Sequence, residues 1–233
     1  ITLLMYSLKN FAQTIDIKVD TAPPKHNTFF AANHPLIQYT GRIDFSKAAL
    51  PRMWSPGVYI SVQFKGSAII AVIKDQELWG KNHNYLEIII DGNKKRIQTK
   101  AKTNYIAVSN LTDSFHSLMI CKNTESNIGY IEFAGVYCDD LTKPLPKPKR
   151  KIEFIGNSIT CGASSDISEM PCGKGVWQDQ HNAYMAYGPV TARSLNAQWH
   201  LTAVSGIGLI HSCCNLDIIM PPVFDKIDLR GDS

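Results

Sequence analysis

The sequence has no long apolar run, no dense block of one charge and no paired-cysteine motif. Its 24 Lys and Arg residues nearly balance 20 Asp and Glu residues, so the net charge of +4 gives no electrostatic reason to expect a nucleic-acid partner. No stretch is long enough to span a bilayer. The six cysteines lack C-x-x-C spacing, which argues against a zinc or dithiol site. We therefore predict no metal, no cofactor, no nucleic-acid partner and no membrane span.

The chain begins with a short apolar run, ITLLMYSLKNFAQT, that does not open with Met. An apolar segment followed by a small residue, here Ala12, is typical of the end of a secretory signal. We therefore interpret residues 1–13 as a signal-peptide remnant and expect a secreted or periplasmic protein; an ordinary first strand is the alternative. In an oxidising compartment Cys161 and Cys172 would be able to close a short loop as a disulfide, although free buried cysteines are also common.

Residues 14–142 show no 3.6-residue helical period. Short apolar segments follow one another instead, at the spacing of an all-β sandwich. The clearest is YLEIIIDGNKKRIQTK (85–100), where Asp91 and Gly92 supply the positive φ angles that a tight hairpin requires. We predict a β-sandwich of the jelly-roll type for this half of the chain.

Residues 143–150, KPLPKPKR, predict a solvated linker, with contact to an anionic polymer as the alternative. After it, KIEFIG (151–156) is a nearly continuous apolar strand, suited to burial on both faces of a parallel sheet. WHLTAVSG (199–206) predicts a second such strand. We expect residues 151–233 to form the first part of an α/β domain.

The segment between these strands, residues 182–197, predicts one helix with Pro189 at its start or at a kink. Four residues of helical spacing are expected on one side of this helix: Tyr184, Tyr187, Thr191 and Leu195. Strand, helix and strand together predict a βαβ unit.

The stretch IEFIGNSITCG (152–162) ends a strand with a serine between two glycines. A serine at the carboxyl end of a parallel strand projects into the crevice where open α/β sheets bind ligands. The N–H of Ser158 would also point to where an oxyanion forms. The alternative is that Ser158 only caps the following helix, which serine does well. The spacing alone leaves both interpretations open.

The same stretch resembles the first sequence block of the SGNH (GDSL-type) hydrolases. Other segments extend the likeness: YTGRIDFS (39–46), PGVYISVQFKGSAI (56–69), HNAYMAYGPVTARSLNAQWHL (181–201) and SGIGL (205–209). Together they resemble carbohydrate esterase family 2, from about residue 36 onward. That resemblance implies two domains, an all-β jelly-roll sandwich followed by an α/β/α (flavodoxin-like) SGNH domain.

The resemblance also implies a function, removal of acetyl groups from plant cell-wall polysaccharides such as xylan or mannan without a metal. Ser158 would be the catalytic nucleophile, and the N–H groups of Ser158 and Gly206 would form the oxyanion hole. Gly208 is the nearest rival donor. Trp177 is a candidate for the substrate rim, in the loop between strand and helix. The implied partner is an acetylated polysaccharide or oligosaccharide.

Two departures from the family pattern affect this hypothesis. Asn157 stands where the family has Asp. A third block with its Asn and a late catalytic His are not found, and no histidine follows His211. His211 is a weak candidate for the base, whereas His181 and His200 are expected to be structural. We interpret the sequence as part of a longer protein, inactive alone and with exposed apolar sheet edges; the closing GDS (231–233) is a coincidental echo of the family tripeptide.

A rival hypothesis is a non-catalytic carbohydrate-binding β-sandwich with a degenerate hydrolase domain. Tryptophans are the residues that would stack on sugar rings. Of these, Trp199 is expected in the core and Trp54 under a loop. Trp79 and Trp177 are not expected to be buried in this way. A thioesterase or lipase of the SGNH type fits less well, because such enzymes do not generally carry this jelly roll.

Overall fold

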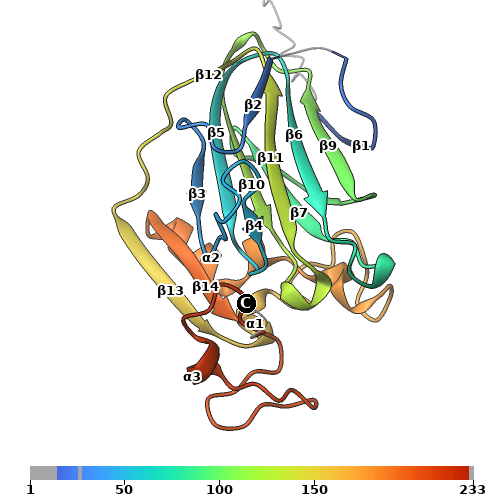
Figure 1. The fold of residues 1–233 in the computed structure, drawn as a ribbon, viewed down its shortest axis with the longest axis vertical. Coiled ribbons are helices and arrows are strands. Elements are labelled where there is room, and N and C mark those ends of the chain that lie inside the picture. The colour runs from blue at the N-terminus through green and yellow to red at the C-terminus, as the bar shows by residue number, and fades with distance from the viewer. Residues whose placement is uncertain (1–14, 26–27, 231–233) are drawn as a thin grey trace, which may run out of the picture.

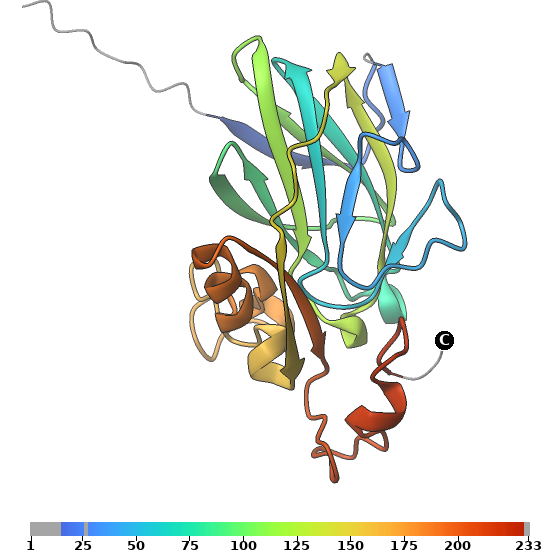
Figure 2. The same cartoon turned by 90° about the vertical axis from the view of Figure 1, so that its left-hand side faces the viewer.

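The computed structural model describes residues 15–25 and 28–230. The first part is a β-sandwich of two six-stranded antiparallel sheets, and a smaller part with helices lies at one end of it (Figures 1 and 2). The predicted signal remnant and the closing GDS lie outside the described residues. Among the described residues, no helix is long and apolar enough to cross a membrane.

The strands of the sandwich are short, and their order in space differs from their order in the chain. The first sheet contains β1 (Asp16–Asp20), β9 (Thr103–Ser109), β6 (Ile69–Asp75), β11 (Ile131–Cys138) and β2 (Thr28–Ala31), with β4 (Arg52–Met53) paired to β11. The second contains β12 (Asp140–Leu141), β5 (Tyr59–Gly66), β10 (Ser114–Lys122), β7 (Tyr85–Ile90) and β8 (Asn93–Gln98), with β3 (Gln38–Thr40) paired to β5. Two 3₁₀ turns, η1 (Leu78–Gly80) and η2 (Ser126–Ile128), complete this part.

The core lies between the two sheets because side chains alternate along each strand. In β9 every second residue is buried. Phe64 of one sheet and Phe133 of the other are both fully buried in a single apolar cluster. The predicted hairpin is confirmed, since β7 pairs with β8 and the turn residues Asp91 and Gly92 have φ angles of 49° and 84°.

The second part contains one parallel strand pair. Its strands are β13 (Arg150–Gly156) and β14 (Ala197–Ala203), and its helices are α1 (Ser158–Cys161), η3 (Trp177–Gln180), η4 (Ala183–Met185), α2 (Tyr187–Ser194) and α3 (Met220–Val223). The predicted strand–helix–strand order is confirmed. The full α/β/α sandwich stays an expectation.

Two local predictions are wrong. First, β13 is not buried on both faces: its residues alternate between exposed and half-buried, and Ile155 is 51% exposed. Second, residues 182–197 form a 3₁₀ turn and then the short helix α2 rather than one helix. The buried face of α2 consists of Gly188, Pro189 and Ala192, because these small residues allow the helix to lie close to the strands.

The four residues expected on one side of a single helix do not share one environment. Tyr187 is 49% and Leu195 46% exposed, and Thr191 is also exposed. Only Tyr184, in η4, is half-buried and packs against the smaller core. Pro189 lies in the first turn of α2, where its missing N–H costs nothing.

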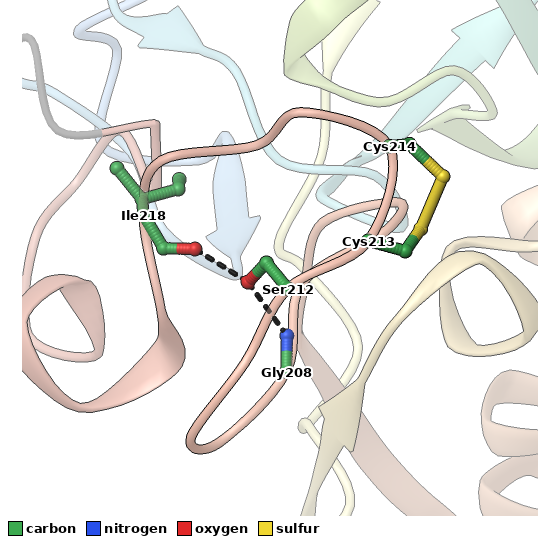
Figure 3. The surroundings of a disulfide bond; sticks show 5 residues. All are labelled: Gly208, Ser212, Cys213, Cys214 and Ile218. Carbon is green, nitrogen blue, oxygen red and sulfur yellow. Dashed lines mark hydrogen bonds between the residues drawn. A yellow bond between two sulfur atoms is a disulfide. The ribbon is translucent and has the colours of Figure 1, made fainter.

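The disulfide considered between Cys161 and Cys172 is not formed, and the alternative of free cysteines holds for both. Cys161 is free and buried, and Cys172 is free and exposed. The structure instead joins the adjacent Cys213 and Cys214 in the loop after β14 (Figure 3). Cys161 sits in the last position of α1, where burial, the largest cause, raises the pKa of its thiol.

The two parts of the molecule share a core. Trp199 of β14 is 3% exposed, and its ring lies 4.2 Å from that of Tyr59 in β5. The Trp199 indole N–H donates to the Gly57 carbonyl at 2.8 Å. This confirms the expected core position of Trp199 and fixes the parallel strand pair against the sandwich.

The Pro-rich linker runs as an extended segment along the outside of the sandwich (Figures 1 and 2). Leu145 is 62% exposed, as expected for a solvated linker. The linker is nevertheless tied down, since the Lys147 ammonium donates to the Tyr39 carbonyl and the Gln198 amide to the Pro148 carbonyl. It covers a cavity of about 330 Å³ whose wall includes Trp199.

Candidate active site

The two candidate residues of the site follow neighbouring parallel strands. Gly156, the last residue of β13, is in register with Ala203, the last residue of β14. Ser158 comes two residues after the first strand end and Gly206 three residues after the second. Because the carboxyl ends of parallel strands meet at one edge of a sheet, the topology brings Ser158 and Gly206 to the same edge.

Ser158 opens α1 but does not cap it. The cap is Asn157, whose side-chain oxygen accepts a hydrogen bond from the Ile159 N–H at 3.3 Å. The interpretation of Ser158 as the helix cap is therefore wrong. The Ser158 hydroxyl is half-buried and makes no side-chain hydrogen bond within the described part of the chain. It is thus left available for chemistry.

Asn157 performs its role through the amide oxygen, an acceptor that Asp would also supply. The substitution of Asn for the expected Asp is therefore compatible with the observed turn. Gly162 closes the same helix with φ of +84°, and its carbonyl accepts from the Asn182 N–H at 2.9 Å. A Cβ at Gly162 would lie 2.7 Å from the Asn182 carbonyl carbon, so only glycine fits.

Gly206 and Gly208 differ in whether their N–H groups are engaged. The Gly208 N–H donates to the Ser212 hydroxyl at 3.0 Å, and that hydroxyl donates to the Ile218 carbonyl at 2.5 Å (Figure 3). Gly206 accepts from the Cys213 N–H at 2.9 Å, whereas no hydrogen bond from its own N–H is found within residues 28–230. The structure therefore favours Gly206 over Gly208 as the free donor.

No histidine of the described part of the chain is hydrogen-bonded to Ser158. His181 is fully buried with neither ring nitrogen bonded, and burial, the largest cause, lowers its pKa to about 4. Burial also lowers the pKa of His200, whose Nε2 accepts from the Arg42 guanidinium at 3.1 Å. His211 is exposed on the loop after Gly206, and no bond connects it to Ser158 there. The buried His181 and the half-buried His200 both have structural surroundings, as expected.

Trp177, the candidate for the substrate rim, is 47% exposed at the start of η3 and lies edge-on to His181, with ring centroids 4.1 Å apart. The sandwich holds this segment. The Arg96 guanidinium donates to the Asp179 and His181 carbonyls, both at 2.7 Å, and the Tyr85 hydroxyl donates to the Asp179 carboxylate at 2.7 Å. No contact places Trp177 against Ser158, so its role stays a prediction.

Sequence reasoning missed one residue that the structure brings to the site, Glu125 of the sandwich. It accepts two hydrogen bonds from Ser205, the residue before Gly206. Nothing in the local sequence KNTES marks it, since it precedes Ser205 by 80 residues and only the packing of the two parts joins them.

Several known proteins resemble this chain. A family model described as carbohydrate esterase 2 N-terminal matches residues 39–148. Cellulase/esterase CelE from Acetivibrio thermocellus is 36% identical over 186 residues, which are 76% of this chain and 21% of the relative. An acetylxylan esterase / glucomannan deacetylase from Cellvibrio japonicus is 32% identical over 160 residues, 67% of this chain and 42% of the relative.

A solved family two carbohydrate esterase from Clostridium thermocellum, in complex with cellohexaose, matches with a TM-score of 0.73 and 29% identity, over 84% of this chain and 60% of that chain. The fold and these relatives define the class: proteins related to carbohydrate esterases, with a jelly-roll N-terminal domain. Within that class, residues 39–148 belong to the N-terminal domain of carbohydrate esterase family 2, which confirms the resemblance seen in the sequence. The chain spans no more than half the length of the three curated relatives, at 21%, 42% and 50%.

Proposed function

We propose that the protein is a secreted serine esterase that removes O-acetyl groups from plant cell-wall polysaccharide of the xylan or mannan type. The observation that carries the proposal is the position of Ser158. It follows a parallel strand, and its hydroxyl is not used to cap α1, because Asn157 is the cap. Relatives described as acetylxylan esterases and a relative structure with bound cellohexaose support a polysaccharide substrate.

The proposed reaction has two steps. The Ser158 oxygen attacks the acetyl carbonyl carbon while its proton passes to a general base, and the sugar hydroxyl leaves with a proton. Water then attacks the acetyl-enzyme, releases acetate and restores the serine. In each step the carbonyl oxygen becomes negative, and the Ser158 and Gly206 N–H groups would stabilise it, at roughly 3–4 kcal/mol of barrier per donor.

Because none of the described histidines is hydrogen-bonded to Ser158, we expect the 233-residue chain alone to hydrolyse acetyl esters slowly or not at all. Activity should be measured on this chain and on the protein encoded by the complete open reading frame, with p-nitrophenyl acetate, acetylated xylan and acetylated glucomannan. Ser158→Ala should abolish acetate release. Ser67→Ala, at an exposed serine of the sandwich, is the matched control and should leave it unchanged. Acetate release that survives Ser158→Ala would overturn the proposal.

A non-catalytic binding function has one observation in its favour: Trp79 is 78% exposed at η1 of the sandwich. Retention of the chain on insoluble xylan or mannan that is lost in Trp79→Ala but kept in Ser158→Ala would support it. Loss of retention in Trp177→Ala instead would favour a substrate rim in the second part of the molecule.

A further inference from the structure

Glu125 is a buried carboxylate of the sandwich whose hydrogen bonds leave the sandwich. It precedes η2, and the residue is 1% exposed. One oxygen accepts from the Ser205 N–H at 2.8 Å, and the other accepts from the Ser205 hydroxyl at 2.5 Å. Two bonds to one residue fix both the backbone and the side chain immediately before Gly206.

The same carboxylate also lies near α1, the helix that follows the other strand. Cys161, the last residue of α1, is 1% exposed, and burial and then the nearby Glu125 raise the pKa of its thiol. Ser158 is the first residue of that single-turn helix. Glu125 is thus bonded to the residue before Gly206 and lies near Cys161, which is three residues after Ser158.

Glu125 has little charge compensation. Only the His181 Nδ1, at 4.0 Å, lies within ion-pair reach in the described residues, and the lowered pKa of His181 leaves that ring neutral at pH 7. The buried Lys122 ammonium attracts Glu125 but donates to main-chain carbonyls, including that of Trp54 at 3.0 Å. A buried carboxylate without a paired cation is costly, whereas a neutral side chain would fill the space at lower cost.

We propose that Glu125 is a positioning residue that holds the Gly206 N–H in line with the Ser158 N–H, so that the jelly roll completes the oxyanion hole of the neighbouring part. This inference rests on the proposed esterase function. It assigns the sandwich a direct part in acyl transfer, beyond any part in binding substrate, since the donor geometry at a developing oxyanion must be held to within a fraction of an ångström.

The kinetic test uses the protein encoded by the complete open reading frame. Glu125→Gln keeps the size but places an amide N–H₂ against one Ser205 donor, and Ser205→Ala removes the hydroxyl bond alone. We expect kcat to fall about 10- to 100-fold in the first variant and less in the second, with KM within about threefold, because the oxyanion forms only in the transition state. Glu132→Gln, at a buried sandwich carboxylate paired with Arg52, is the control and should leave kcat unchanged.

A second readout does not depend on turnover. Amide hydrogen exchange of a peptide covering residues 204–208 should become faster in Glu125→Gln and unchanged in Glu132→Gln, while the exchange of the sandwich strands stays as in the wild type. Unchanged exchange in Glu125→Gln would overturn the positioning role. If Glu125→Gln is too unstable to measure, Ser205→Ala takes its place, and unchanged exchange in that variant would overturn the role in the same way.

The outcomes separate the two proposals. A wild-type kcat in Glu125→Gln, in an enzyme that Ser158→Ala inactivates, would refute the role of Glu125 and leave the esterase function standing. Activity that survives Ser158→Ala would refute the esterase function, and the role of Glu125 at an oxyanion with it.

Discussion

The sandwich and the parallel strand pair use similar sequence patterns but differ in how they are covered. In β9 of the sandwich, one set of alternating residues is buried and the other half-buried, because a second sheet lies against one face. In β13, the corresponding sets are half-buried and exposed. Ile155, Ile159 and Ile210 are 51%, 71% and 76% exposed. The apolar residues of a strand therefore indicate which face is suited to burial. Whether that face is buried depends on the elements that pack against the strand.

The contact between the two regions shows where the strand pair does find cover. Trp199, Leu201 and Ala197 of β14 pack against Tyr59 and Cys121 of the sandwich. The sandwich thus supplies one wall of the core of the strand pair. We expect the strand pair to depend on the sandwich for its stability more than the sandwich depends on it.

The largest expected difference between the regions is in core truncation. Phe133→Ala should lower the free energy of unfolding by about 3–5 kcal/mol, because it opens a cavity between two sheets that cannot collapse. Ile155→Ala, at a half-exposed site of β13, should cost about 1 kcal/mol or less. Urea unfolding followed by tryptophan fluorescence measures both. Equal losses would show that β13 is covered in solution, contrary to the contrast drawn above.

The next largest effect is the pH dependence of the free energy of unfolding that arises from His181, which lies where the two regions are in contact. Its pKa is lowered to about 4 from an ordinary value of 6.5, so the unfolded chain binds a proton that the folded chain does not. The free energy of unfolding should therefore fall as the pH drops from about 7 toward 4, by about 1–2 kcal/mol between pH 7 and pH 5 from this residue. His181→Leu should remove that part of the slope.

Other groups also contribute to the pH dependence, so the comparison between wild type and variant is the informative quantity. The lowered pKa of His200 acts in the same direction as that of His181, and the raised pKa values of Glu87 and Glu125 act in the opposite direction. Unfolding curves at several pH values measure the difference. A His181→Leu variant with the wild-type slope would contradict the neutral, buried assignment of His181.

Much of the fold was predictable because it follows from local patterns. The Asp91–Gly92 hairpin depends on two turn residues, and the parallel pairing of β13 and β14 depends on strand–helix–strand order. The position of Ser158 after a strand also followed from the sequence. The faces of α2 did not, because the small residues Gly188 and Ala192 bury themselves by close approach, which a search for large apolar residues overlooks.

The parts of the site that escaped prediction depend on distant residues. Glu125 meets Ser205 only after the sandwich and the strand pair have packed together. The choice between Gly206 and Gly208 depends on the hydroxyl of Ser212, which accepts a hydrogen bond from the Gly208 N–H. Cys161 and Cys172 stay apart because α1 carries Cys161 into the interior, whereas Cys172 is exposed.

The smallest expected effect tests the turn that presents Ser158. Asn157 caps α1 through an acceptor oxygen, so Asn157→Ala should cost about 1 kcal/mol, and Asn157→Asp should change stability by no more than about 0.5 kcal/mol, since Asp caps equally well. Thermal unfolding measures both. A cost for Asp as large as that for Ala would mean that the amide N–H₂ of Asn157, and not its oxygen, holds the turn; the released hydroxyl of Ser158 would then need another explanation. Equal behaviour of Asn and Asp would show that this turn tolerates either residue because it uses only the oxygen that both side chains share.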